Sequence, residues 1–105
     1  MIMTEHNKAI RDKIPEIIKQ SGNDCNVKIL SDSEFLKKLE DKLSEEVSEY
    51  QESKSLEELA DILEVIHRIL EINKIPKEKL DEIRIMKKDE RGGFKNNLFL
   101  IDSST

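Results

Sequence analysis

Two neighbouring stretches of this sequence, 31–53 and 55–73, combine a helix start signal with apolar residues at helical spacing. The first opens with SDSE and the second with SLEE, and both have the Ser-x-x-Glu form of a capping box. Apolar residues then recur every three or four positions, which is the period of one face of an α-helix. We therefore expect two long helices, and the short connection between them predicts an antiparallel pair. The apolar positions are Leu36, Leu39, Leu43, Val47 and Tyr50 in the first stretch and Leu59, Ile62, Leu63, Ile66, Ile69 and Leu70 in the second.

Proline and glycine place the remaining elements. A short helix is expected from Pro15 to about Gly22, and a further helix from Pro76 to about Arg91, where two glycines follow. Residues 7–14 are expected to be extended or irregular, and residues 23–30 to form a turn followed by a brief strand. The fold class predicted is all-α, with one domain over residues 1–105.

The composition predicts a small core that a second copy of the chain completes. The 105 residues include one Tyr, three Phe and no Trp, so Ile and Leu must form most of the core. A chain this short buries only a limited fraction of its surface. Val65 and Ile72 also fall outside the main apolar face of their helix, on a neighbouring flank that needs its own cover. We therefore expect a homodimer or a homotetramer.

The charge and the cysteine content limit which partners and which cellular compartment we expect for the protein. The net charge of −5 disfavours binding to nucleic acid, which is itself anionic. No apolar run reaches the roughly 18 residues of a membrane span, and the start MIMTEHNKAIRDK lacks the apolar core of a signal peptide. Cys25 is the single cysteine, so no intrachain disulfide can form, which favours a reducing compartment. These features predict a cytoplasmic protein without nucleic-acid or membrane partners.

Acidic residues cluster on both long helices, close to their connection. On a helical wheel Glu46 lies only about 50° from the centre of its apolar stripe, whereas Glu45 lies about 150° away and is expected to be solvated. Glu58 and Asp61 fall on the second apolar flank of their own helix. An antiparallel pair would bring these two acids near Glu46 and Glu49, where their mutual repulsion favours a bound cation.

The same residues also have a simpler explanation, and the spacing alone leaves both open. Glu58 occupies the capping-box position after Ser55, and exposed Glu is common on helix surfaces. If a metal does bind, the lack of clustered Cys and His in the sequence leaves oxygen ligands, which favour a hard cation. The candidate ion is then Mg²⁺ or Mn²⁺.

The E-x-x-E motif from Glu46 and the E-x-x-D motif from Glu58 resemble the metal motif of the MazG-like, all-α nucleoside triphosphate pyrophosphohydrolases. Two further stretches, NKAIRDKIPEII (7–18) and KKDERGGFKNNLFL (87–100), are similar to the terminal signatures of a small single-domain branch of that family, the phosphoribosyl-ATP pyrophosphohydrolase-like proteins. Together with KLSEEVSEY and EELADILEVI, the resemblance covers nearly the whole chain in order. It implies a helical bundle with a central antiparallel hairpin, completed by oligomerisation.

The resemblance also implies a reaction, the hydrolysis of a nucleoside triphosphate between its α and β phosphates as part of nucleotide house-cleaning. Mg²⁺ would offset the phosphate charge and activate a water nucleophile, with one carboxylate, such as Glu49, as its base. Cationic side chains in the two terminal signatures would hold the outer phosphates, although solvated or helix-terminal charges are the simpler alternative for each. The implied metal ligands and catalytic residues are Glu46, Glu49, Glu58 and Asp61, and the implied substrate-binding residues are Arg11, Lys13, Lys87, Arg91 and Lys95.

Two other functions stay open at this point. Hydrolysis of phosphoribosyl-ATP in histidine biosynthesis would use the same metal and the same type of bond. A non-catalytic helical module for oligomerisation or regulation would carry its acids only as surface charges.

Overall fold

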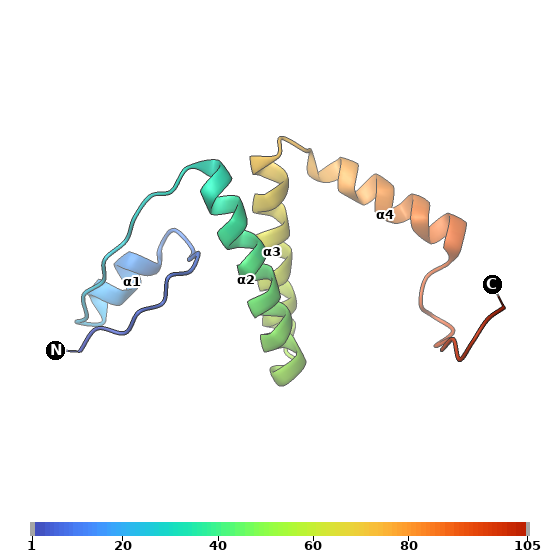
Figure 1. The fold of residues 1–105 in the computed structure, drawn as a ribbon, viewed down its shortest axis with the longest axis horizontal. Coiled ribbons are helices and arrows are strands. Elements are labelled where there is room, and N and C mark those ends of the chain that lie inside the picture. The colour runs from blue at the N-terminus through green and yellow to red at the C-terminus, as the bar shows by residue number, and fades with distance from the viewer. Residues whose placement is uncertain (1, 105) are drawn as a thin grey trace. The chain divides into compact units, whose positions relative to one another are not determined.

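The structure is a computed structural model, and it describes residues 2–104. Four helices and no strand occur among these residues (Figure 1). The all-α prediction is therefore confirmed. No helix in this part of the chain is long and apolar enough to cross a lipid bilayer. The helices are α1 (Ile14–Gln20), α2 (Asp32–Ser53), α3 (Leu56–Ile72) and α4 (Lys77–Arg91).

The brief strand expected within residues 23–30 does not form, and that prediction was wrong. Val27 and Ile29 are exposed, and the segment carries no regular structure. A strand needs a neighbouring backbone to pair with its N–H and C=O groups. The described part of the chain contains no strand to pair with it, and the backbone groups of the helices are already used within each helix. Branched apolar residues therefore favour a strand only where a sheet exists to receive it.

The two expected capping boxes have different outcomes. Ser31 caps α2, because its Oγ accepts from the backbone N–H of Glu34 at 3.3 Å and the Glu34 carboxylate accepts from the Ser31 N–H at 3.4 Å. Ser55 precedes α3, but its side chain makes no capping hydrogen bond. The second capping box was therefore wrongly predicted, and capping does not explain Glu58.

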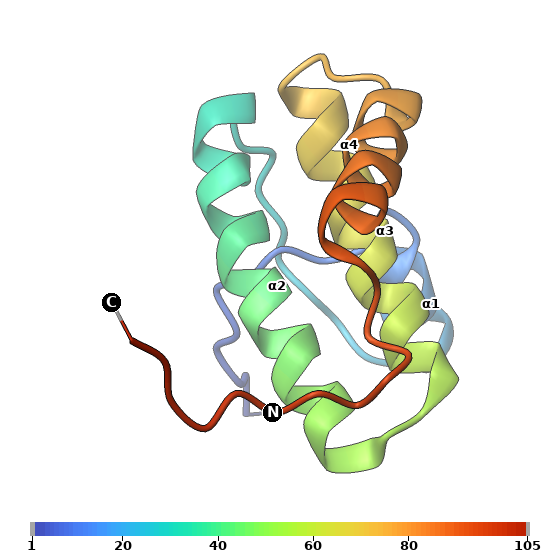
Figure 2. The same ribbon diagram turned by 90° about the vertical axis from the view of Figure 1, so that its right-hand side faces the viewer.

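A tight turn joins α2 to α3. Lys54 adopts a left-handed conformation with φ of 58°, and its N–H donates to the Tyr50 carbonyl at 2.7 Å, which ends α2. Only Lys54 and Ser55 lie between the two helices. The chain therefore reverses at once, and α3 runs back alongside α2 as an antiparallel pair (Figure 2).

The chain divides into two compact units after Lys74. The first unit holds α1, α2 and α3, and the second holds α4 and the residues that follow it. This division describes how segments pack, and the single domain expected over residues 1–105 stays a prediction.

The core of the first unit lies between α2, α3 and the N-terminal segment. Ala9, Leu39 and Val65 are its buried members. Because Ala9 lies well before α2 in sequence, its burial holds the N-terminal segment against the helix pair. The partly buried side chains around them are Phe35, Leu43, Ile69 and Ile72.

The buried face of α3 matches the expected one only in part. Val65 and Ile72, which were expected to need a cover from another chain, belong to the core of the first unit. From the expected main face, Ile69 packs against this core and Leu70 is buried, whereas Leu59 and Leu63 are 44% and 51% exposed. A helix that is apolar over a wide arc can bury either side of that arc. The side that is buried also carries the acidic pair of α3, so packing draws both acids towards α2.

In the second unit, α4 begins directly after Pro76 and ends at Arg91, as the sequence predicted. Gly92 follows with φ of 84°, a backbone conformation that glycine adopts without the strain of a side chain.

Candidate metal centre

The acidic residues continue the two stripes by which α2 and α3 pack together. On α2, Glu46 follows Leu39 and Leu43 at helical spacing, and on α3, Asp61 precedes Val65 by about one turn. A side chain on such a stripe is turned towards the partner helix. Near the turn that joins the helices, the interface therefore ends in carboxylates where apolar side chains would otherwise lie.

Glu46 is the only buried charged residue within 2–104, with 5% of its surface exposed, as its position on the helical wheel predicted. Its Oε1 pairs with Lys42 Nζ at 3.2 Å. Its Oε2 is buried and has no hydrogen-bond partner in the protein. A buried carboxylate oxygen without a donor or a cation costs free energy, so this atom marks the place where a cation would stabilise the protein.

Glu46, Glu58 and Asp61 each present a carboxylate oxygen within 4.8 Å of the other two. One oxygen of Glu58, Oε2, is also buried without a partner. An overlapping group of the same size joins Glu46 to Glu45 and Glu49. The four residues that the sequence singled out thus gather along the α2–α3 interface, and Glu46 belongs to both groups.

Crowding changes the acidity of these carboxylates. Partial burial, together with the neighbouring charges of Glu49, Glu46 and Asp61, raises the pKa of Glu58 from 4.5 to about 7. The close approach of Glu46 raises the pKa of Glu49 as well. In both cases the existing negative charge opposes the loss of a proton. A divalent cation would act in the opposite direction, because it favours the ionised form of every carboxylate near it.

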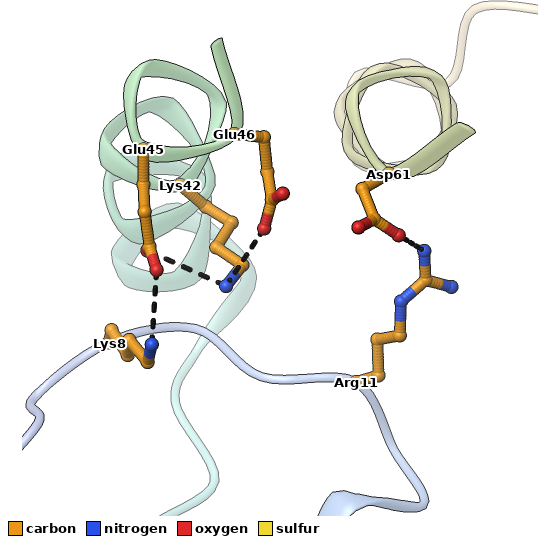
Figure 3. Close-up of polar contacts among 6 residues, drawn as sticks. All are labelled: Lys8, Arg11, Lys42, Glu45, Glu46 and Asp61. Atoms are coloured by element: carbon orange, nitrogen blue, oxygen red, sulfur yellow. Dashed lines mark hydrogen bonds and ion pairs between the residues drawn. The ribbon is translucent and has the colours of Figure 1, made fainter. Parts of the chain in front are cut away.

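Arg11, which the resemblance assigned to phosphate binding, lies at the edge of this cluster. Its guanidinium donates to Asp61 Oδ1 at 2.7 Å (Figure 3). The buried Ala9, two residues earlier, fixes the segment so that Arg11 reaches α3. More than half of the Arg11 side chain is exposed, so its guanidinium is accessible to a ligand.

The expectation that Glu45 is a solvated charge was wrong. Lys8 donates to Glu45 Oε1 at 3.0 Å, Lys42 donates to Glu45 Oε2 at 3.5 Å, and 31% of the Glu45 side chain is exposed. The cause is the N-terminal segment, which covers this side of α2. The pKa of Glu45 is lowered, mainly by the hydrogen bond from Lys8.

Lys8 and Lys42 were missed as members of the site. Lys42 stands four residues before Glu46, which is the spacing of side chains that meet on one helix face, and that signal could have identified it. The contact of Lys8 depends on how a distant segment folds back, and no local pattern in the sequence predicts it.

The other predicted phosphate-binding residues belong to both units of the chain. Lys13 is exposed at the start of α1. Lys87, Arg91 and Lys95 belong to the second unit, where Arg91 and Lys95 line one small pocket that also includes the two glycines after α4. Their part in phosphate binding stays a prediction.

The donor set suits a hard divalent cation. All candidate ligands are carboxylates, and two of their oxygens are buried without a donor from the protein. When all side chains are ionised, five carboxylates meet three cationic groups, which leaves two negative charges for a bound ion to balance. This acidic cluster could therefore hold a metal ion. The carboxylates are Glu45, Glu46, Glu49, Glu58 and Asp61, and the cationic groups are Lys8, Arg11 and Lys42.

Comparisons of the chain with family models, with curated proteins and with solved structures found no match. The motifs of the chain and the chemistry of the acidic cluster are therefore the features that indicate its function.

Proposed function

We propose that this protein is a nucleoside triphosphate pyrophosphohydrolase that depends on Mg²⁺ or Mn²⁺. The observation that carries the proposal is the buried Glu46, with one oxygen unpaired and the carboxylates of Glu58 and Asp61 within 4.8 Å. Enclosed carboxylates with perturbed acidity are typical of functional sites and of metal ligands. The reaction class comes from the resemblance of the acidic motifs and the terminal signatures to MazG-like enzymes.

In the proposed site, Glu46, Glu49, Glu58 and Asp61 hold the cation. When bound, it would offset the charge of the phosphates and lower the pKa of a water nucleophile. The Glu49 carboxylate would accept the proton of that water. Arg11 borders the same cluster and would donate to a phosphate oxygen of the substrate. Lys13, Lys87, Arg91 and Lys95 are proposed as further phosphate contacts.

The reaction proposed is cleavage between the α and β phosphates, which releases the nucleoside monophosphate and pyrophosphate. Removal of unwanted nucleotides from the cytoplasmic pool is the role that this chemistry would serve. We propose a homodimer or a homotetramer as the active form, because Leu59 and Leu63 on α3 are left about half exposed in the single chain.

A panel of nucleoside triphosphates and phosphoribosyl-ATP, assayed with Mg²⁺ and with Mn²⁺ for pyrophosphate release, tests the proposal. We expect release of pyrophosphate with at least one nucleoside triphosphate, and none after chelation of the metal. Turnover of phosphoribosyl-ATP alone would assign the protein to histidine biosynthesis. Release of orthophosphate in place of pyrophosphate would contradict the bond assignment.

The exposed apolar face of α3 also favours a second candidate, a non-catalytic module for oligomerisation or regulation. Such a module would use the apolar face as its interface, but it would not require buried carboxylates without a partner. Absence of hydrolysis across the whole panel, together with no stabilisation by divalent cations, would favour it over the enzyme.

A further inference from the structure

Lys42 occupies an unusual place for a lysine side chain. It is 18% exposed, and its ammonium group contacts both Glu46 Oε1 at 3.2 Å and Glu45 Oε2 at 3.5 Å. Lysine ammonium groups are usually solvated, and their burial requires paired acceptors. The Lys42 ammonium group is therefore held between two carboxylates in the wall of the site.

Figure 3 shows that the two oxygens of the Glu46 carboxylate have different surroundings. The oxygen bonded to Lys42 points towards the ammonium group of that residue, and the other oxygen lies on the side of Asp61. That second oxygen is the one that is buried without a partner. Arg11 holds Asp61 in the same way, with one oxygen bonded to the guanidinium and the other turned towards Glu46.

We infer that Lys42 is a positioning residue of the metal centre, which fixes the Glu46 carboxylate so that Oε2 faces the ion. This inference rests on the proposed function, because it assumes that Glu46 is a ligand. Groups that hydrogen-bond the outer atoms of metal ligands orient them, and their loss typically costs about 10- to 100-fold in metal affinity.

The alternative is that Lys42 acts only through its charge. A cation near the site repels Mg²⁺, so removing its charge without any positioning effect should tighten metal binding. Positioning predicts weaker binding for the same substitution. The two explanations therefore differ in the sign of one measurable change.

The experiment is calorimetric titration of the full-length protein with Mg²⁺, for the wild type and three variants. Lys42→Met keeps the unbranched stem of the side chain but removes the ammonium group and its charge, and we expect the dissociation constant for Mg²⁺ to rise about 10-fold. Lys42→Arg keeps a donor for Glu46 and should retain most of the affinity. Lys37→Met is the matched control, since Lys37 is an exposed residue of the same helix that lies outside the acidic cluster. The Mg²⁺ affinity of this variant should be unchanged or slightly higher.

Circular dichroism and thermal melting would show whether each variant is folded. If Lys42→Met does not fold, a double variant with Lys42→Met and Glu46→Gln replaces it, because Glu46→Gln removes the buried charge that would be left without a partner. The reference for the double variant is Glu46→Gln alone. The double variant and Glu46→Gln should then bind Mg²⁺ with equal affinity, because neither has a carboxylate at position 46 for Lys42 to orient.

Unchanged or tighter Mg²⁺ binding in Lys42→Met would overturn the inference and leave the metal site intact. An equal loss in Lys37→Met would also overturn it, because the effect would not depend on the contact with Glu46. In the folded double variant, a further loss of affinity relative to Glu46→Gln would do the same. Failure of the wild type to bind Mg²⁺ at all would reject the metal site itself, and with it both the proposed function and this role of Lys42.

Discussion

The side chain of Glu58 lies between α2 and α3 with one oxygen unpaired, and its pKa is about 7 against an ordinary value of 4.5. The folded protein therefore binds this proton more tightly than the unfolded chain does. The stability that Glu58 contributes is present in full below about pH 4.5 and is lost as the pH rises to about 7. Without divalent cations, we expect the free energy of unfolding to fall across this window, as measured by denaturant titration at several pH values. The lowered pKa values of Glu34 and Glu45 reduce the free energy of unfolding only as the pH falls below about 4.5, outside this window.

Substitution of Glu58 by Gln tests whether that residue causes the fall. The variant should show a flatter dependence of unfolding free energy on pH and, near neutral pH without metal, should melt at least as high as the wild type. Glu64→Gln, at an exposed position on the same helix, is the control and should keep the wild-type dependence. A Glu58→Gln variant with an unchanged pH profile would show that the cluster does not strain the folded protein.

Single residues differ in how far the sequence alone predicts their surroundings. The burial of Glu46 followed from its angle to the apolar stripe of its own helix, which is a local property. The pairing of Glu45 did not, because Lys8 reaches it from 37 residues away. The angle of a residue on a helical wheel predicts which neighbours it has on its own helix, but not which distant segment covers it.

At the scale of elements, the helices were predictable because their start and stop signals are local. Pro76 and the glycines around α4, and Ser31 with Glu34 at the start of α2, all act within one turn. The packing face of α3 was predictable only in part. Its apolar arc offers two sides, and the choice between them depends on α2 and on the N-terminal segment.

The capping difference between α2 and α3 gives a prediction for these two helices. Ser31→Ala removes the hydrogen bond to the Glu34 N–H and should lower the free energy of unfolding by about 1 kcal/mol. Ser55→Ala is the matched control, and because Ser55 makes no capping hydrogen bond, its cost should be clearly smaller. Chemical denaturation of both variants measures the difference. Equal losses would mean that the start of α3 depends on Ser55 in solution.

At the scale of the whole molecule, the apolar side chains of α3 that α2 does not cover predict self-association. Leu59 and Leu63 lie one turn apart on this face, and Leu56 before them is also exposed. A second copy of the chain could bury them and supply the core that a 105-residue chain lacks. Sedimentation at micromolar concentration should show a dimer or a tetramer, and Leu63→Glu should shift it towards monomer. A well-folded wild-type monomer would contradict this prediction.

We propose that Glu46, Glu49, Glu58 and Asp61 form one metal centre, and direct binding of Mn²⁺, measured by electron paramagnetic resonance, tests this proposal. Asp61→Asn keeps the shape of the side chain and removes one anionic ligand, whereas Glu64→Gln removes one exposed charge from the same helix. We expect the wild type and Glu64→Gln to bind Mn²⁺ with similar affinity, and Asp61→Asn to bind it at least about 10-fold more weakly. Equal binding by all three proteins, or no binding by the wild type, would show that these four carboxylates do not form a shared metal centre.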